Sequence, residues 1–205
     1  MIDGSIRSVP SATRRSEQSR RAALDAALAL VTELPYPRIT VDAIAARAGV
    51  SKATIYRWWP AKGALVVEAL AQRSADRPGE HLVLPDTGDL GADLAGVLRA
   101  IVDELADPAY DALFRALSIE SLQDPTLRDQ VRAQIFDIQL EHVEVRFAAA
   151  RAAGQLRDDV STLEAFELFV APVFHRWQGA TAPLTHAYAD GVAERAMRAL
   201  APRPG

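Results

Sequence analysis

The sequence predicts an all-α fold in two parts, an N-terminal unit of three helices followed by a larger helical bundle. Three observations support this prediction. Apolar residues recur at spacings of three and four along most of the chain, which is the period of amphipathic helices. Proline and glycine interrupt this pattern between the expected helices. The charge is also divided, since residues 1–75 carry 11 Arg or Lys against 6 Asp or Glu, whereas residues 76–205 carry 12 against 21.

The composition excludes several classes of protein. The 205 residues are 49% hydrophobic and 24% charged, which is typical of a globular chain. Cysteine is absent from the sequence, and this excludes disulfide scaffolds, zinc fingers, iron–sulfur sites and thiolate catalysis. No apolar run is long enough for a membrane span, and the first sixteen residues lack the apolar core of a signal peptide. A cytoplasmic protein is therefore expected.

The sequence also lacks the common motifs of catalysis. Its four histidines have no metal-ligand spacing, and it contains no phosphate loop, nucleotide-binding fingerprint or nucleophile elbow. We therefore expect no metal, no cofactor and no enzymatic activity. The alternative is a helical-bundle enzyme, or a ligand-binding module, that acts on a hydrophobic small molecule, because a cavity with one histidine can support acid–base chemistry.

The charge division suggests three segments. Residues 1–16 are polar and contain Gly, Pro, Ser and three arginines, so they predict a flexible basic arm. Residues 17–75 form a basic head suited to a polyanion, and residues 76–205 form an acidic body with a different role. The head contains the only two lysines of the chain, Lys52 and Lys62. A lysine ammonium is a compact point charge that suits a phosphate.

Two longer helices are expected at the two ends of the head. The first runs from Glu17 to Leu34, because its apolar residues recur at spacings of 4, 3 and 3. Pro35 and Pro37 end it, since each lacks a backbone donor and disfavours helix in the residue before it. The last helix of the head is expected over about residues 61–73.

Two short helices lie between these longer ones. Thr40 is a good N-cap for the first, and Ser51 for the second, which runs from Lys52 to Trp58. Gly49 can adopt the left-handed conformation that ends the first helix. This arrangement is the sequence form of a helix-turn-helix, whose second helix is short enough to lie in a major groove. A tight helical corner in an enzyme is the alternative, and the basic head disfavours it.

One segment of the head resembles the DNA-binding motif of TetR-family transcriptional regulators. It covers residues 40–66 and reads TVDAIAARAGVSKATIYRWWPAKGALV. The matching positions are Thr40, Ile44, Ala45, Ala48, Gly49, Val50, Ser51, Tyr56, Lys62 and Leu65. The segment departs from the family pattern at Trp58-Trp59-Pro60, where histidine, phenylalanine and a polar residue are usual. The resemblance implies a homodimer that binds a palindromic operator in double-stranded DNA, with a C-terminal domain for effector binding and dimerisation.

Eight residues of this segment are candidate DNA contacts. Four match family positions that mostly contact phosphates, namely Thr40, Thr54, Tyr56 and Lys62. Four more are placed to read base edges or thymine methyl groups, namely Lys52, Ala53, Arg57 and Trp58. The ring of Tyr56 packing on the first helix is the alternative at that position. Arginines near the start of the chain either add minor-groove or phosphate contacts or are simply solvated, namely Arg14, Arg15, Arg20 and Arg21.

The body is expected to contain five helices after a linker rich in Pro, Gly and Asp at residues 75–91. The ranges are about 90–105, 110–117, 125–153, 162–177 and 184–200. The long helix 125–153 carries two apolar stripes on nearly opposite faces, so we expect it to lie between two layers of the bundle. Gly154 ends this helix, and Pro172 lies inside the next one and should kink it.

The body is also where the resemblance implies an effector cavity and a dimer interface on the last two helices. The candidate effector contacts are aromatic, apolar or polar residues, namely Phe114, Phe136, Gln139, His142, Phe166, Phe169, Val170, Phe174, His175 and Trp177. The alternative is a solid core with His142 as a satisfied core group. The candidate dimer contacts are Ala165, Leu168, Pro172, Leu184, Tyr188, Val192 and Ala196. The function expected is that of a repressor released from its operator by a small, mainly apolar effector.

Overall fold

The computed structural model describes residues 11–76 and 84–202 of the chain. Every regular element in these two ranges is a helix, which confirms the all-α prediction. The helices are α1 (Ser11–Glu33), α2 (Val41–Ala48), α3 (Lys52–Trp58), α4 (Lys62–Asp76), α5 (Leu90–Ala106), α6 (Pro108–Gln123), α7 (Pro125–Val131), α8 (Asp137–Ala152), α9 (Thr162–Gly179) and α10 (His186–Leu200). A 3₁₀ turn, η1 (Tyr36–Arg38), follows α1, and a π-helical segment, η2 (Arg132–Phe136), joins α7 to α8.

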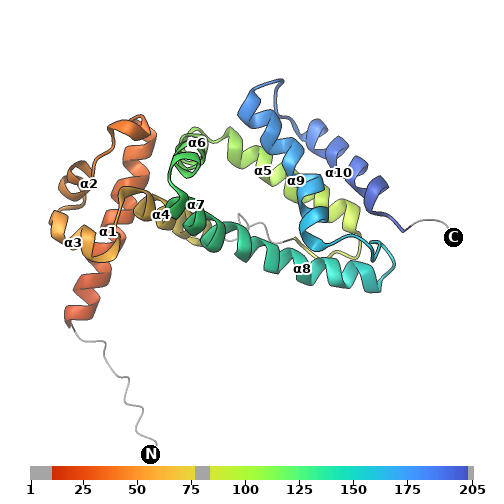
Figure 1. The fold of residues 1–205 in the computed structure, drawn as a ribbon, viewed down its shortest axis with the longest axis horizontal. Coiled ribbons are helices and arrows are strands. Elements are labelled where there is room, and N and C mark those ends of the chain that lie inside the picture. Colours follow the sequence, from red (N-terminus) through yellow and green to blue (C-terminus); the bar gives the residue numbers. More distant parts are fainter. Residues whose placement is uncertain (1–10, 77–83, 203–205) are drawn as a thin grey trace, which may run out of the picture.

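The described part of the chain is elongated. Helices α1–α4 lie at one end, and α5, α9 and α10 lie at the other (Figure 1). Helices α6 and α7 stand between the two groups, and α8 runs from α7 along one side of the body. The head and the body expected from the sequence are therefore both present.

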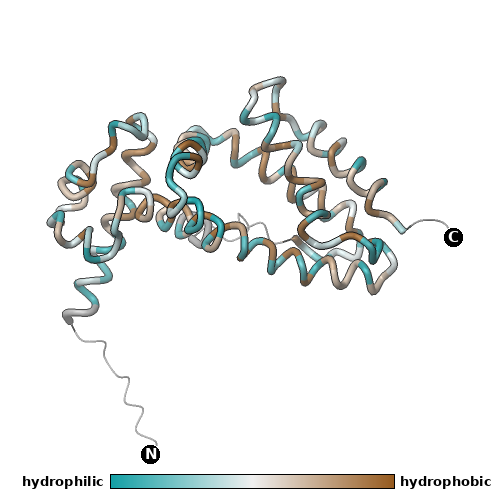
Figure 2. Tube along the Cα trace, viewed as in Figure 1, coloured by the Kyte–Doolittle hydropathy of each residue, from teal (hydrophilic) through white to brown (hydrophobic). Residues whose placement is uncertain are grey.

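Helix α1 starts earlier than the sequence analysis predicted. It begins at Ser11 rather than at Glu17, so residues 11–16 of the expected flexible arm are helical. Those residues include neither proline nor glycine, so nothing in the sequence breaks the helix there. The first turns of α1 are mainly hydrophilic, whereas apolar residues recur along α5 and α9 (Figure 2). Residues 1–10 of the expected arm lie outside the described residues.

The two short helices of the head have the predicted bounds and caps. The hydroxyl of Thr40 accepts a hydrogen bond from the backbone N–H of Ala43, and the hydroxyl of Ser51 accepts one from Thr54. Gly49 has φ +66°, the left-handed conformation expected at the end of α2. The helix-turn-helix is therefore confirmed, and its geometry is set by residues within the segment itself.

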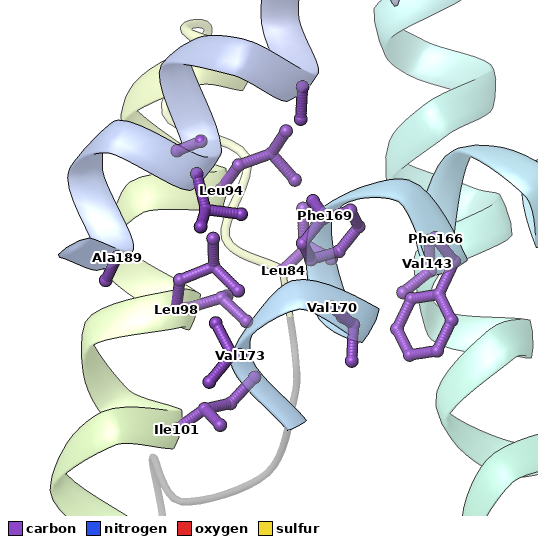
Figure 3. Close-up of a cluster of buried hydrophobic side chains, with 14 of the residues drawn as sticks. Leu84, Leu94, Leu98, Ile101, Val143, Phe166, Phe169, Val170, Val173 and Ala189 are labelled. Atoms are coloured by element: carbon purple, nitrogen blue, oxygen red, sulfur yellow. The ribbon is translucent and has the colours of Figure 1, made fainter. Parts of the chain in front are cut away.

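The body has a core built from four helices. Helix α10 packs on α5, and α9 lies against both α8 and α10. Leu94 and Leu98 of α5 meet Val173 of α9 and Ala189 of α10, while Val143 joins from α8 (Figure 3). All of these side chains are buried. The burial of this apolar surface is the main force that holds the bundle together.

The same core overturns three of the predicted dimer contacts. Ala165, Val192 and Ala196 are at most 2% exposed and belong to the core of their own chain. The apolar row of α10 therefore faces α5 rather than a partner subunit. The sequence pattern correctly identifies an apolar face. It does not show whether that face packs against another helix of the same chain or against a partner subunit.

The predicted sandwiching of the long helix is wrong for its C-terminal part, α8. Only one face of α8 is buried, through Val143, Phe147 and Ala150. On the opposite side Ile138 is exposed and Val145 is 74% exposed. The chain supplies one covering layer for this helix, where the two apolar stripes in the sequence had suggested two.

The head core extends beyond the predicted boundary at residue 75. Leu113 and Leu117 of α6 and Leu127 of α7 are buried in the same apolar cluster as α1 and α4. Two elements that the sequence analysis assigned to the body therefore complete the core of the head. This packing brings α6 and α7 into direct contact with α1 and α4 of the head.

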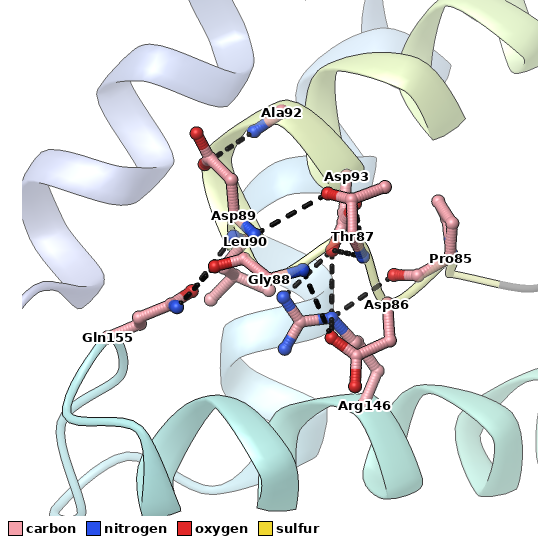
Figure 4. A network of polar contacts seen from close by, with 10 residues as sticks. All are labelled: Pro85, Asp86, Thr87, Gly88, Asp89, Leu90, Ala92, Asp93, Arg146 and Gln155. Carbon is pink, nitrogen blue, oxygen red and sulfur yellow. Dashed lines mark hydrogen bonds and ion pairs between the residues drawn. The ribbon is translucent and has the colours of Figure 1, made fainter.

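A buried ion pair joins α5 to α8. The side chains of Arg146 and Asp93 are 3% and 0% exposed, and Arg146 Nε donates to Asp93 Oδ2 at 2.8 Å. Arg146 Nε also donates to the carbonyl of Pro85 at 3.1 Å, and Thr87 Oγ1 donates to Asp93 Oδ1 at 2.6 Å (Figure 4). Gln155 hydrogen-bonds the same loop from beyond the end of α8. These contacts fix the segment that leads into α5.

The first prediction concerns this pair. Arg146→Met should destabilise the protein by about 3–5 kcal/mol, because it leaves the buried Asp93 carboxylate without its partner. Chemical denaturation monitored by circular dichroism measures the change. The matched control is Arg198→Met, which removes an exposed pair with Glu194 on α10 and should leave the unfolding midpoint unchanged. Equal midpoints for the two variants would contradict the assigned role of Arg146.

Candidate nucleic-acid interface and ligand pocket

The outer face of α3 is a polar and aromatic surface. Ile55 and Trp59 are buried in the head core, so the inner face of α3 is held against the rest of the head. Helices α2 and α3 lie at the end of the molecule farthest from α9 and α10 (Figure 1). The exposed residues of α3 are Lys52, Ala53, Tyr56, Arg57 and Trp58. Five of the eight candidate DNA contacts therefore share one open face.

The C-terminal end of α3 is fastened to α1 and α4 through one carboxylate. Trp59 Nε1 donates to Glu68 Oε2 at 2.8 Å, and Arg20 of α1 forms an ion pair with the same carboxylate. The guanidinium of Arg20 also lies 5.5 Å from the ring centroid of Trp58. The sequence departs from the usual motif at Trp58 and Trp59. The Glu68 carboxylate holds Trp59 directly and pairs with Arg20, which lies beside Trp58. Local sequence reasoning missed this role of Glu68.

Arg57 reaches back to the start of α1. Its Nη2 donates to Ser16 Oγ at 3.1 Å, and its guanidinium lies 5.8 Å from the ring centroid of Trp58. Together with Arg20 it places two cations around one exposed indole. A cation beside an aromatic face is stabilising even at exposed sites. The exposed end of α3 is therefore an ordered cationic and aromatic surface.

Lys52 and the two threonines have partners within the head. Lys52 Nζ donates to Asp42 Oδ2 at 3.0 Å, and this hydrogen bond raises the pKa of Lys52 above its ordinary value. Thr40 and Thr54 are engaged in the caps of α2 and α3, and Thr54 Oγ1 lies 2.8 Å from Ser51 Oγ. These hydroxyls stabilise the helix starts in the free protein.

Lys62 lies apart from the exposed face of α3. Its Nζ donates to the carbonyl of Tyr36 at 3.1 Å and sits 3.8 Å from the centroid of that ring. Loss of hydration lowers the pKa of Lys62. Burial, helped by the carboxylates of Glu120 and Asp124, raises the pKa of Tyr36. A phosphate contact by Lys62 requires its side chain to leave this junction between head and body.

A cavity of about 650 Å³ lies between α6, the α7–η2–α8 run and α9. Its lining is mostly apolar and includes several phenylalanine rings. The lining residues are Phe114, Leu117, Ser118, Ser121, Arg128, Val131, Arg132, Ile135, Phe136, Asp137, Leu140, Leu163, Phe166, Glu167, Val170, Ala171, Phe174 and Gln178. The volume and the apolar lining are typical of a site for a small organic molecule.

Half of the predicted effector contacts line this cavity. The residues that do so are Phe114, Phe136, Phe166, Val170 and Phe174. The other five do not. Phe169 and Trp177 are buried in the body core, and His142 and His175 lie on exposed faces of α8 and α9. Gln139 is partly buried but lies outside the cavity lining. His142 is therefore not a core group, and it lies outside the cavity lining.

The sequence analysis missed the wall formed by α6 and α7. Leu117, Ser118 and Ser121 face the cavity from α6, and Arg128 and Val131 face it from α7. These residues form a wall only because α6 and α7 pack against the head. No local pattern predicts that packing, although the amphipathic spacing of α6 could have indicated a second face.

The charged groups of the lining come in both signs. Arg132 forms a long ion pair with Asp137 at 3.7 Å, and both of these side chains are substantially exposed. Arg128 and Glu167 add one further charge of each sign. The lining therefore carries no formal net charge.

Residues 11–76 and 84–202 contain neither a metal-ligating cluster nor a membrane-spanning helix. Within them, no group of three or more His, Asp or Glu side chains is arranged to hold a metal ion. None of the helices in the same ranges is long and apolar enough to cross a membrane.

Comparison with known proteins matches both parts of the chain to one family. Residues 23–69 match the model described as bacterial regulatory proteins of the tetR family. Residues 84–196, more than half of the chain, match the tetracyclin repressor-like C-terminal domain. The chain belongs to the TetR family of transcriptional regulators.

Individual relatives support the assignment to the TetR family. The HTH-type transcriptional regulator YdeS of Bacillus subtilis is 29% identical over 162 residues, 79% of each chain. The DNA-binding transcriptional repressor TetR of Mycobacteroides abscessus is 32% identical over 165 residues, 79% of this chain and 83% of that relative. Among solved structures, the TetR-family regulator SCO0332 superposes with a TM-score of 0.74 at 27% identity, over 90% of this chain and all of that one.

Membership of the TetR family decides between the two functions considered from the sequence, a DNA-binding regulator and a helical-bundle enzyme. A TetR-family regulator binds DNA through its helix-turn-helix and is not an enzyme. The predicted DNA-binding function is therefore confirmed, and the helical-bundle enzyme considered as an alternative is excluded. The exposed face of α3 is the open side of the second helix of this helix-turn-helix.

The second prediction concerns Arg57. Arg57→Ala should relax discrimination at one base position by about 1–3 kcal/mol, because it removes a guanidinium from the exposed face of α3. Fluorescence anisotropy against single-base variants of an operator selected from random DNA measures the change. Arg47→Ala is the control, since Arg47 lies on α2 and is held by Glu33 of α1. Uniform weakening across all variants would assign Arg57 to phosphate contact instead.

Proposed function

We propose that this TetR-family protein is a repressor that binds a palindromic operator as a homodimer and is released by a small, mainly apolar effector held in the cavity of the body. Two heads with α3 in successive major grooves imply half-site centres about 34–36 Å apart. The observation that carries the proposal is that the cavity and the core of the head share one wall.

The shared wall consists of side chains that face the cavity on one side and the core of the head on the other. Phe114, Leu117, Val131 and Ile135 line the cavity, and they also pack in the apolar cluster of the head. Protein interiors are close-packed, so a side chain displaced on one side presses on its neighbours on the other. An effector that moves this wall therefore acts directly on the packing of the head.

Gly63 and Leu127 are in close contact where α4 meets α7. Leu127 of α7 is 3% exposed. A Cβ atom added at Gly63, in the first turn of α4, would lie 2.9 Å from both Cδ atoms of Leu127. Helix α4 follows α3 after a short connection that contains the buried Trp59. A shift of α7 therefore reaches α3 through α4.

The effector must favour the state of the protein that does not bind DNA. A ligand with equal affinity for both states shifts no equilibrium, however tightly it binds. The mechanism we propose is that an occupied cavity favours a wider separation of the two heads. The coupling expected for such a switch is about 1–3 kcal/mol.

The dimer interface in this proposal lies on α9 and α10. Leu168 of α9 is 43% exposed. Pro172, Leu184 and Tyr188 are partly buried, and Tyr188 Oη donates to the carbonyl of Pro172 at 3.1 Å. These residues form the outer part of the α9–α10 pair and support an interface there with Leu168 at its centre.

The third prediction tests the cavity. Leu140→Trp should weaken binding of N-phenyl-1-naphthylamine, a neutral aromatic fluorophore, because the larger side chain narrows the cavity where α8 lines it. Fluorescence titration measures probe binding. Val145→Trp is the control, since Val145 lies on the exposed side of α8, outside the cavity lining. Probe binding to the Leu140 variant as tight as to the wild type would place the ligand site elsewhere.

The fourth prediction tests the contact between α4 and α7. Gly63→Ala should weaken operator binding at least about fivefold without any ligand, because the new methyl group pushes Leu127 and α7 away from α4. Gly96→Ala on α5 is the matched control, since its Cβ would meet no atom within 4 Å. Operator titrations of the two variants give the comparison. Equal affinities would show that this contact does not position the head.

A further inference from the structure

Two polar residues near the N-terminus of α1 contact the C-terminal end of α3. Ser16 and Arg20 stand four residues apart, so they lie on the same face of α1. Ser16 Oγ accepts a hydrogen bond from Arg57 Nη2 at 3.1 Å. The guanidinium of Arg20 lies 5.5 Å from the ring centroid of the neighbouring Trp58. This face of α1 therefore supports the two exposed residues that end α3.

Arg57 differs from Lys52 and Arg20 in the kind of partner that it has. Lys52 forms an ion pair with Asp42, and Arg20 is held by two carboxylates. Within the described part of the chain, no carboxylate pairs with Arg57, and its hydrogen-bond partner is the neutral hydroxyl of Ser16. The positive charge of Arg57 is therefore not neutralised by an ion pair, and it remains available for a charge-assisted hydrogen bond to DNA.

The bond to Ser16 leaves most of the Arg57 guanidinium open. A guanidinium carries five N–H donors in a planar fork, and Ser16 engages only one of its nitrogens, Nη2. The ring of Trp58, whose centroid lies 5.8 Å away, restricts the side chain further. Because Arg57 is exposed, its remaining donors can reach acceptors on a base edge or a phosphate.

Holding a long side chain in place before binding favours the complex. A free arginine side chain samples many rotamers, and the entropy lost when they are fixed opposes association. The contacts of Arg57 with Ser16 and Trp58 restrict these rotamers before DNA is bound. They depend on the early start of α1, because residues 11–16 are helical and this carries the Ser16 hydroxyl to α3.

We propose that Ser16 is a positioning residue for DNA recognition, and that its hydroxyl holds the Arg57 guanidinium in the orientation in which Arg57 contacts DNA. Ser16 lies outside residues 40–66, which form the helix-turn-helix segment, and it acts through Arg57. The inference goes beyond the proposed function, because it concerns neither the effector nor the dimer. It needs only the DNA binding that membership of the TetR family shows.

The test measures DNA binding by the full-length wild type, Ser16→Ala, Ser16→Thr, Arg57→Ala and the double alanine variant. Fluorescence anisotropy gives their dissociation constants for an operator selected from random DNA with the wild type, and for its single-base variants. Ser19→Ala is the matched control, because the Ser19 hydroxyl donates to the carbonyl of Arg15 within α1 at 2.9 Å. Both serine-to-alanine changes raise the helix propensity of α1 equally, so an effect of helix stability would appear in both.

We expect Ser16→Ala to weaken operator binding about fivefold, which corresponds to the loss of one hydrogen bond. Its losses across the single-base variants should follow the same pattern as those of Arg57→Ala. The double variant should bind no more weakly than Arg57→Ala alone, because Ser16 acts through that side chain. Ser16→Thr, which keeps a hydroxyl, and Ser19→Ala should both stay within about twofold of the wild type.

Several outcomes would overturn the role of Ser16. Wild-type binding by Ser16→Ala or by Arg57→Ala would show that their hydrogen bond has no part in the complex. Tighter binding by Ser16→Ala would show that the hydroxyl holds Arg57 away from DNA. Losses that add in the double variant would show that Ser16 acts independently of Arg57, and an equal loss in Ser19→Ala would assign the effect to α1 as a helix. All of these results would leave the proposed effector cavity and dimer unaffected.

Discussion

The burial of α6 and α7 against α1 and α4 is the constraint on which the rest of the structure depends. Without it, Leu113, Leu117 and Leu127 would be exposed, and burying one such side chain is worth about 1.5–3 kcal/mol. The head needs these residues as well, because a unit of four helices, two of which have only seven or eight residues, has little core of its own. Head and body are therefore parts of one continuous packing arrangement, and a change in either is opposed or transmitted by the other.

The two ends of the α7–η2–α8 run are held in different ways. The C-terminal half of α8 is fixed by Phe147 in the body core and by the buried pair of Arg146 with Asp93. The N-terminal half lines the cavity, and Ile138 remains exposed there. A buried, hydrogen-bonded ion pair resists displacement more than an open apolar wall does. Any movement caused by a ligand is therefore concentrated at α7, where the run meets the head.

The sequence was sufficient wherever structure depends on neighbours in the chain. Thr40, Gly49 and Ser51 define the helix-turn-helix because caps and a left-handed glycine act over three or four residues. The apolar face of α9 was likewise visible from its periodicity. The sequence could not show which helix packs against each apolar face. His142 is exposed and Val192 is buried, because long-range packing, and not periodicity, decides which apolar stripe is covered.

The π-helical segment η2 has a consequence for how this protein can change over evolution. Its backbone bond runs from Asp137 N to Arg132 O, five residues apart, which is the signature of one residue added to an α-helix. Removing one residue there would turn everything after it by about 100°. Arg146 would then face away from Asp93, and the wall of the cavity would lose its present register. A change in the length of this segment therefore disturbs the body more than an exchange of one side chain of the cavity lining does.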